Sequence, residues 1–373
     1  MAETKIIDLP TPCLLVDLEI AKGNAQRMLN TATEMGVEIR PHMKTHKTLE
    51  GGVMMTGGRK SKICVSTLQE ARFFSAGGFT DILYSIPITE NKIKICQQTI
   101  KEVPDLKLMF DSRYGLQCIM NNPRPDGKPW SAIMEVDCGY ARTGIEWDGE
   151  EILAIAQEAD KCPTIHFMGL YVHCGDSYNA ESVEEIHAIG DRTAERLVEV
   201  ARRLKDRGIN CETVGTGSTP CCNQPSKKMA NLTEFHPGCY IFNDYGLTLN
   251  GSCARSEIAI KVATRVIDYK KSKNVVLVDC GFLALSLDGI LEGGYGGMCS
   301  IQDHPELKMK AMDQELGKLT AADGQQLDFD KYPIGTLLYI YPFHACHTAA
   351  MHPVYYVHSG DTVVDKWTPT RGW

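Results

Sequence analysis

Short apolar runs alternate with helix-like segments through most of this chain, and this alternation restricts the possible folds more than any other feature. Eight candidate strands fall before residue 243, separated by helical stretches. They cover residues 37–39, 63–65, 82–86, 106–110, 132–137, 167–173, 213–214 and 240–242. Strand–helix alternation predicts a parallel sheet, and eight such units predict an α/β fold of the (β/α)8 TIM-barrel type. A doubly wound open sheet is the alternative.

The rest of the chain predicts a second, mainly β domain. From residue 254 the apolar runs are strand-like and largely alternating, at 258–267, 274–279, 335–341 and 354–363. A strand near Thr11, entered through Pro12, is expected to join them. We therefore expect a barrel domain over residues 15–253 and a β-rich domain made of residues 1–14 and 254–373.

Three helices are indicated by their ends or their length. Residues 18–35 have helical spacing and stop at Gly36, a suitable C-cap. Residues 66–71 carry a capping pattern, Ser-Thr-Leu-Gln-Glu-Ala, that opens a second helix. Residues 182–207 form the clearest amphipathic stretch in the chain.

Composition excludes several classes of partner. The net charge of -8, with no basic tail or charge block, argues against nucleic acid and anionic membrane. No apolar run approaches the roughly 20 residues that a membrane span needs. The 15 cysteines have no regular spacing, and no apolar signal region precedes them. Free thiols in the reducing cytoplasm are therefore expected rather than disulfides.

The segment 37–48 runs from a short strand into a cationic end where His42, Lys44 and His46 alternate. On an extended chain this spacing points all three side chains the same way. A lysine near other cations and away from bulk water loses proton affinity, as an amine must to form a Schiff base and later act as a base. A solvated basic loop is the alternative interpretation.

Other polar residues follow the later strands, at the ends where barrels carry their chemistry. The small residues of the run 215–220, Gly-Thr-Gly-Ser-Thr-Pro, let backbone N–H groups approach an anion. The run lacks the Walker lysine and the Rossmann glycine spacing, so we expect a single phosphate or a plain turn rather than a nucleotide site. Gly238 and Cys239, one unit later, could add backbone donors.

Side chains after two other strands could meet a flat, anionic ligand. Arg142 has a forked guanidinium that suits a phenolate or carboxylate oxygen, although a surface ion pair would explain it equally well. Tyr171, His173 and Tyr178 surround another strand end. Aromatic rings there could sandwich a flat cofactor or simply belong to the core.

The second domain contains His344 and Cys346, which would point to one side of an extended chain. Imidazole and thiolate together suit zinc better than magnesium or calcium. Two ligands cannot close a structural zinc site, so an open catalytic site fits better. Whether His347 or His352 takes part stays open.

Four ordered motifs resemble those of the eukaryotic D-serine dehydratases. These are alanine-racemase-like pyridoxal-phosphate enzymes, with the D-threonine aldolases as near relatives. The motifs are Arg-Pro-His-Met-Lys-Thr-His-Lys-Thr at 40–48, Tyr-Val-His-Cys-Gly-Asp-Ser-Tyr at 171–178, Gly-Thr-Gly-Ser-Thr-Pro at 215–220 and His-Ala-Cys at 344–346. The resemblance runs from about residue 11 to residue 373.

The resemblance implies a barrel plus a β domain in a homodimer, with pyridoxal 5'-phosphate and Zn2+ as cofactors. By resemblance, Lys44 forms the Schiff base and Arg142 contacts the phenolic oxygen of the ring. The other implied cofactor contacts are Tyr171, Tyr178, Gly217, Ser218, Thr219, Gly238 and Cys239. His344 and Cys346 would bind the zinc. The aldolases are expected to carry an aspartate at the position of Cys346, so this cysteine favours the dehydratases.

The implied reaction is the elimination of water from D-serine to give pyruvate and ammonia. Lys44 would remove the Cα proton, and zinc would stabilise the departing β-hydroxyl. The alternatives are a D-threonine aldolase, a D-threo-3-hydroxyaspartate dehydratase and a non-enzymatic pyridoxal-phosphate carrier. The β domain with its His-x-Cys pair argues against the carrier.

Overall fold

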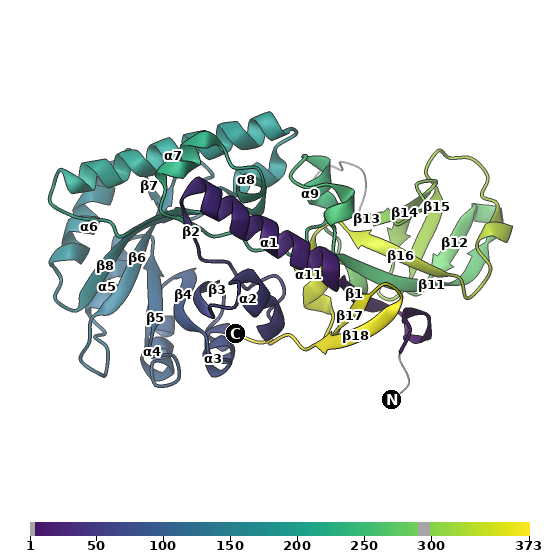
Figure 1. Ribbon diagram of the computed structural model, residues 1–373, viewed down its shortest axis with the longest axis horizontal. Coiled ribbons are helices and arrows are strands. Elements are labelled where there is room, and N and C mark those ends of the chain that lie inside the picture. The colour runs from purple at the N-terminus through teal and green to yellow at the C-terminus, as the bar shows by residue number, and fades with distance from the viewer. Residues whose placement is uncertain (1–3, 290–298) are drawn as a thin grey trace. The chain divides into compact units, whose positions relative to one another are not determined.

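The computed structural model describes residues 4–289 and 299–373, which pack into two compact units (Figure 1). The barrel unit comprises Ala25–Gly238 and Thr370–Trp373, and the β-rich unit comprises Met1–Asn24 and Cys239–Pro369. The limits of 15 and 253 expected for the barrel domain stay a prediction. No helix among the described residues is both long and apolar enough to cross a membrane.

Eight parallel strands form the sheet of the barrel unit, in the order β2-β10-β9-β8-β6-β5-β4-β3. A parallel bridge between His42 and Cys64 links the chain just after β2 to β3 and nearly closes the sheet into a barrel. The expected TIM-type barrel is therefore confirmed. The strands are β2 (Glu38–Ile39), β3 (Ser61–Val65), β4 (Thr80–Pro87), β5 (Leu106–Phe110), β6 (Trp130–Asp137), β8 (Ile165–Val172), β9 (Thr213–Thr216) and β10 (Glu234–Phe235), with the short β7 (Ile145–Glu146) paired to β6.

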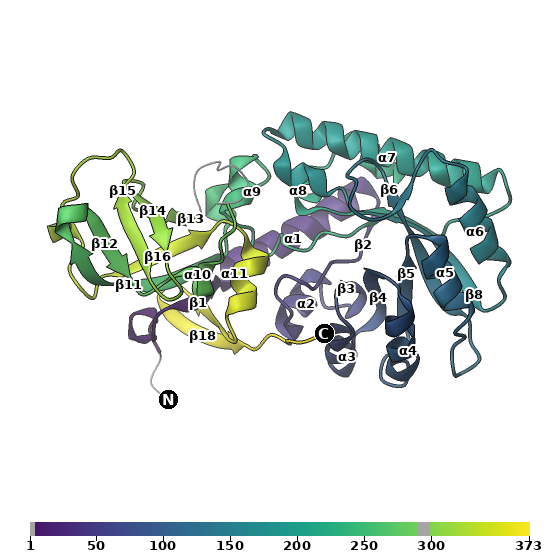
Figure 2. The same cartoon turned by 180° about the vertical axis from the view of Figure 1, so that it is seen from behind.

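Helices surround these strands on the outside, as Figures 1 and 2 show. They are α2 (Leu49–Met55), α3 (Leu68–Ala76), α4 (Glu90–Thr99), α5 (Arg113–Met120), α6 (Glu151–Lys161), α7 (Val183–Lys205) and α8 (Thr219–Asn223). Helix α1 (Leu18–Met35) precedes β2 and stops at Gly36, whose φ of +69° favours glycine. The hydroxyls of Thr67 and Ser182 cap α3 and α7, so all three predicted helices are confirmed.

The barrel interior contains one layer to which five strands each contribute a side chain. Its members are Cys64, Leu83, Met109, Ile133 and Tyr171, all at most 4% exposed. Strand β6 places Glu135 opposite Tyr171 of β8 in parallel register. Since side chains alternate along a strand, Glu135 lies on the same inward face as Ile133, closer to the carboxyl end.

The eighth strand is not the one expected from sequence. Residues 240–242 are buried but form a turn, in which Phe242 and Asn243 both donate N–H bonds to the carbonyl oxygen of Cys239. Glu234–Phe235 takes the eighth position instead and pairs with both β2 and β9. A short apolar run indicates that a segment is buried. Its length alone does not show whether that segment is a strand or a buried turn.

The β-rich unit has strand order β14-β15-β12-β11-β1-β17-β18, with β16 paired to β11 and β13. As expected, the N-terminal strand joins it: β1 (Cys13–Asp17) runs antiparallel to β11 (Ile260–Lys270) and parallel to β17 (Tyr355–Ser359). The remaining strands are β12 (Val275–Val278), β13 (Cys299–Ile301), β14 (Leu307–Met312), β15 (Gly317–Ala321), β16 (Leu337–Pro342) and β18 (Thr362–Trp367). Helices α9 (Tyr245–Leu249), α10 (Phe282–Leu285) and α11 (Ala345–Met351) complete the unit.

Two details of this unit differ from expectation. The run 354–363 is a hairpin of two strands, β17 and β18, and the three strands β13, β14 and β15 were not predicted.

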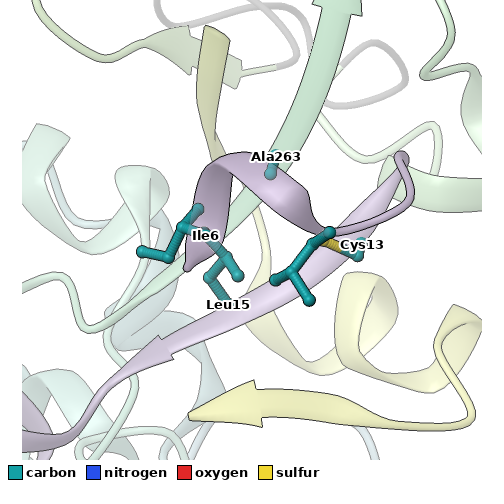
Figure 3. Packing of buried hydrophobic residues seen from close by; sticks show 5 residues of the cluster. Ile6, Cys13, Leu15 and Ala263 are labelled. Atoms are coloured by element: carbon teal, nitrogen blue, oxygen red, sulfur yellow. The ribbon is translucent and has the colours of Figure 1, made fainter. Parts of the chain in front are cut away.

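The N-terminal strand β1 is held in the sheet by side-chain packing as well as by its backbone hydrogen bonds. Figure 3 shows Ile6 beside Cys13 and Leu15 of β1 and Ala263 of β11, in a cluster that also includes Leu9.

Candidate active site

The segment that contains Lys44 turns after β2 instead of running on as a strand. Lys47 donates its N–H to the carbonyl oxygen of Met43, closing a turn over residues 43–46. His46 is fully buried, with its two ring nitrogens 3.0 Å from Thr48 Oγ1 and 3.1 Å from Met55 Sδ. The expectation that His46 points the same way as Lys44 is therefore wrong, because alternation of side chains holds only for an extended backbone.

Two neutral histidines lie near Lys44. His42 accepts the backbone N–H of Lys44 at Nδ1 (3.3 Å), so its Nε2–H faces Ser85 Oγ at 3.0 Å. Burial lowers the pKa of His42 well below its usual value, and the charge of Lys44 lowers it further. Burial, Lys44 and Arg142 together lower the pKa of His173 to about 3. The surroundings of Lys44 thus offer imidazole groups without adding positive charge.

Arg142 follows β6 and faces a buried acid. Its Nη2 atom lies 3.8 Å from Oε1 of Glu135, and its guanidinium lies over the ring of Tyr140. Glu135 also accepts a 2.9 Å hydrogen bond from Thr143. Burial raises the pKa of Glu135 to about 7, although Thr143 and Arg142 oppose the shift. Arg142 is half-exposed, so its fork stays accessible to an anionic ligand.

Tyr171 is buried near the end of β8, and its ring is stacked on that of His236. The two ring centroids lie 4.4 Å apart, with an angle of 6° between the planes. Burial raises the pKa of Tyr171 well above its usual value, so the phenol keeps its proton. His173, two residues further on, donates its Nδ1–H to the carbonyl oxygen of Gly217 at 2.5 Å. The ends of β8, β9 and β10 therefore meet.

The loop after β9 brings several hydroxyl groups together. Ser218 Oγ lies 2.7 Å from Ser177 Oγ and accepts the N–H of Cys221. Thr219 donates its N–H to the hydroxyl of Tyr178 at 3.2 Å. At Gly217 a Cβ atom would lie 2.6 Å from the backbone carbonyl carbon of His236, so only glycine fits there. The structure thus brings Gly217, Ser218, Thr219 and Tyr178 together, and their contact with a cofactor stays a prediction.

Gly238 and Cys239 stand on either side of the division between the two units. A Cβ at Gly238 would lie 3.2 Å from the Cβ of His42, which places this glycine beside the Lys44 segment. The thiol of Cys239 lies 3.5 Å from Asp244 Oδ2 and also interacts with Cys346, all within the β-rich unit.

In the β-rich unit, Asp288, His344 and His347 form a group whose potential ligand atoms all lie within 4.8 Å of one another. His344 donates its Nδ1–H to Asp288 Oδ2 at 2.7 Å, and His347 pairs with the same oxygen. Although burial opposes the shift, these two hydrogen bonds lower the pKa of Asp288. Cys346 also interacts with His344. The group offers imidazole, carboxylate and thiolate ligands, which suit zinc.

The extended geometry assumed for His344 and Cys346 is wrong, because α11 starts at Ala345. On a helix, residues three apart share a face, which explains why His347 lies beside His344. His352 is bonded instead to the carbonyl oxygen of Ala284 at 2.9 Å. Sequence reasoning missed Asp288, a single acid in a Ser-Leu-Asp-Gly run with no spacing that relates it to the histidines.

Two family models match the chain and divide it much as the fold does. Residues 16–246 match the alanine racemase N-terminal domain, and residues 259–358 match the putative serine dehydratase domain. The D-serine dehydratase of Dictyostelium discoideum is 32% identical over 99% of this chain and 98% of its own length. The D-threo-3-hydroxyaspartate dehydratase of Delftia sp. strain HT23 is also 32% identical, over 99% of both chains.

Solved structures agree with these matches. The structure of the Delftia dehydratase superposes with a TM-score of 0.94 and 31% identity, covering 100% of both chains. The D-threonine aldolase of Filomicrobium marinum, at 24% identity and a TM-score of 0.88, shares the fold. The chain belongs to the alanine-racemase-like family of lyases that includes the D-serine and D-threo-3-hydroxyaspartate dehydratases.

Proposed function

We propose that this protein eliminates water from D-serine to give pyruvate and ammonia, with pyridoxal 5'-phosphate and a zinc ion as cofactors. The observation that carries the proposal is the similarity to a D-serine dehydratase, 32% identical along essentially the whole of both chains. A match of that extent includes the barrel, the Lys44 segment and the metal-binding group together. Fold similarity alone would leave the reaction open, since one fold serves many chemistries.

The residues proposed to contact the cofactor, all but Cys239 in the barrel unit, fit pyridoxal phosphate by the chemistry of their groups. Lys44 offers a primary amine for covalent attachment, and Arg142 offers a fork for the phenolic oxygen. Tyr171 and Tyr178 supply flat rings and hydroxyls. The phosphate would be held by the small residues Gly217, Ser218, Thr219, Gly238 and Cys239. The contact between Gly217 and the backbone of His236 supports this, because it keeps a side chain out of the loop.

The chain's own residues then have distinct roles in the reaction. When bound, pyridoxal phosphate supplies an electron sink for negative charge at Cα. Lys44 would act as the base that takes the Cα proton at its Nζ atom. His42 and His173 would remain neutral around it, as their lowered pKa values support. A neutral imidazole can donate and accept hydrogen bonds with the substrate. A charged imidazolium would instead attract the substrate carboxylate.

The metal-binding group fits zinc, and its site would serve the leaving hydroxyl. His344 and Cys346 would be ligands, joined by His347 or Asp288. Both histidines pair with Asp288 through Nδ1, so a carboxylate holds both rings in place, as is common around histidines that bind metals. When bound, zinc supplies a Lewis acid that stabilises negative charge on a departing oxygen.

A second candidate substrate is D-threo-3-hydroxyaspartate. The Delftia dehydratase named for it matches this chain as closely as the Dictyostelium enzyme does. The reaction would be the same elimination on a substrate with one more carboxylate. That carboxylate needs an additional cationic partner, so the two candidates differ in binding and share their chemistry.

A panel of β-hydroxy amino acids tests the proposal. Purified protein, supplied with pyridoxal phosphate and zinc, is assayed with D-serine for pyruvate, D-threo-3-hydroxyaspartate for oxaloacetate and D-threonine for glycine plus acetaldehyde. L-serine is the stereochemical control. We expect the highest kcat/KM for pyruvate formation from D-serine and loss of that activity after chelation. Preferred cleavage of D-threonine, or turnover of no substrate in the panel, would overturn the assignment.

We also propose that the enzyme works as a homodimer in the cytoplasm, as its resemblance to the family implies. Light scattering coupled to size-exclusion chromatography measures the mass in solution. A mass of one chain under assay conditions would contradict the dimer, and fractionation of cells that express the protein would test its compartment.

A further inference from the structure

His236 belongs to a buried polar chain inside the barrel unit, and Arg40 is the one member of that chain that the sequence motifs included. Its Nε2–H donates to Oε1 of Glu234 at 2.9 Å, and the same oxygen accepts the Nε–H of Arg40 at 2.8 Å. Arg40 in turn pairs with Asp81 at 2.6 Å. The side chains of Arg40, Glu234 and His236 are each at most 4% exposed, so water replaces none of these bonds.

The charges in this chain determine the tautomer of the histidine. Burial alone would raise the pKa of Glu234, but Arg40 and then His236 lower it to about 2, so the carboxylate is charged. Burial lowers the pKa of His236, which keeps the ring neutral. A neutral ring that donates from Nε2 has an unprotonated Nδ1. Among the described residues this buried Nδ1 has no hydrogen-bond partner, so the single bond to Glu234 sets the orientation of the ring.

The ring orientation matters because Tyr171 lies parallel to it, at 4.4 Å between centroids and 6° between planes. Among the described residues, His236 is the one aromatic ring stacked on Tyr171. A buried phenol in van der Waals contact with a ring that cannot rotate is itself confined to one rotamer. We propose that His236 is a positioning residue, which holds the Tyr171 phenol in place for the cofactor through the Arg40–Glu234–His236 chain.

This inference rests on the proposed function, since it gives Tyr171 a bound cofactor to contact. It assigns His236 no contact with substrate and no proton transfer. Two variants separate the parts of the role. His236→Phe keeps a flat ring but loses the donor to Glu234, whereas His236→Gln keeps a donor near Glu234 but loses the ring. If Tyr171 needs both the orienting bond to Glu234 and the stacked ring of His236, each variant should displace Tyr171.

The readout is the dissociation constant of pyridoxal phosphate for the apoenzyme, measured by quenching of intrinsic fluorescence, together with the absorption maximum of the bound cofactor. We expect both variants to bind it about five- to tenfold more weakly, because His236→Phe loses the orienting hydrogen bond and His236→Gln loses the stacked ring. We also expect a shifted absorption maximum. His358→Phe, at a buried histidine of β17 bonded to Gly360, is the matched control and should leave both values unchanged.

A double-mutant cycle distinguishes positioning from general destabilisation. In a Tyr171→Phe background, which removes the hydroxyl, His236→Phe should weaken cofactor binding by less than twofold further, since the group that it positions is gone. Full additivity, or unchanged affinity and absorption in both single variants with the wild-type fold by circular dichroism, would overturn the inference. Failure of the wild-type apoenzyme to bind pyridoxal phosphate would instead overturn the proposed function.

Discussion

The Nδ1 atom of His344 lies 2.7 Å from Oδ2 of Asp288, and the same oxygen pairs with His347. Both histidines lie more than fifty positions after Asp288 in the chain, at the start of α11. The aspartate therefore orients both imidazoles at once. The candidate metal site therefore includes residues beyond the His-x-Cys pair visible in the sequence.

Asp288→Asn should weaken zinc binding by about 10- to 100-fold, because it removes the carboxylate that orients both histidines. Metal content after dialysis against a weak chelator, measured by atomic emission, reports the loss. The matched control is Glu306→Gln, which alters another carboxylate–imidazole pair of the same unit, with His304. Equal zinc retention by Asp288→Asn and the wild type would show that Asp288 has no part in the site.

Lys44→Ala should lose covalent attachment of pyridoxal phosphate, because no other amine is proposed to form the linkage. Reduction with borohydride followed by peptide mass spectrometry locates the modified lysine. Lys47→Ala is the control, since its amine pairs with Glu70 at 2.8 Å and should be dispensable for attachment. A modified peptide that maps to another lysine in the wild type would refute the assignment.

Arg40→Met should lower the free energy of unfolding by about 3–5 kcal/mol, because it leaves the buried carboxylate of Glu234 without its main partner. Arg59→Met provides the comparison: Arg59 also pairs with a glutamate, Glu38, at 3.0 Å, but on the surface. That change should cost at most about 1 kcal/mol. Urea denaturation of both variants measures the difference, and equal costs would show that burial of the Arg40 pair is unimportant.

The contribution of the buried histidines His42, His173 and His236 to stability should fall as the pH drops below about 6.5, because unfolded histidines take up protons there and the buried ones do not. The pKa values of His42, His173 and His236 are lowered, that of His173 to about 3. Their contribution is complete above the unfolded pKa and declines by up to about 1.4 kcal/mol per pH unit for each histidine as the pH falls.

Urea denaturation at several pH values between about 8 and 5 measures this slope. His42→Gln should make it shallower, because one buried imidazole is removed. His166→Gln should not change it, since His166 is exposed and bonded to Glu212. A slope in His42→Gln equal to that of the wild type would contradict the predicted role of this buried imidazole.

Local patterns in the sequence were enough to predict the architecture and to locate three of the helices, α1, α3 and α7. Alternation of strands and helices reports which segments can hydrogen-bond side by side, and capping residues such as Thr67 act on backbone groups only a few positions away. The motifs around Lys44, Thr219 and His344 likewise indicated the family, because each lies in one continuous run. Predictions failed where a regular backbone was assumed, at residues 43–46 and at the start of α11.

The partners of these residues depended on packing between segments far apart in the chain. Nothing in the sequence relates His236 to Tyr171, or Asp288 to His344, because no fixed spacing connects residues on different elements. Closure of the barrel brings His236 and Tyr171 within stacking distance, and burial then makes their neighbours and charges matter. The sequence shows which functional groups these side chains carry. Their contacts, the tautomer of each histidine and the shifts in pKa depend on which groups the folded chain brings together and excludes from water.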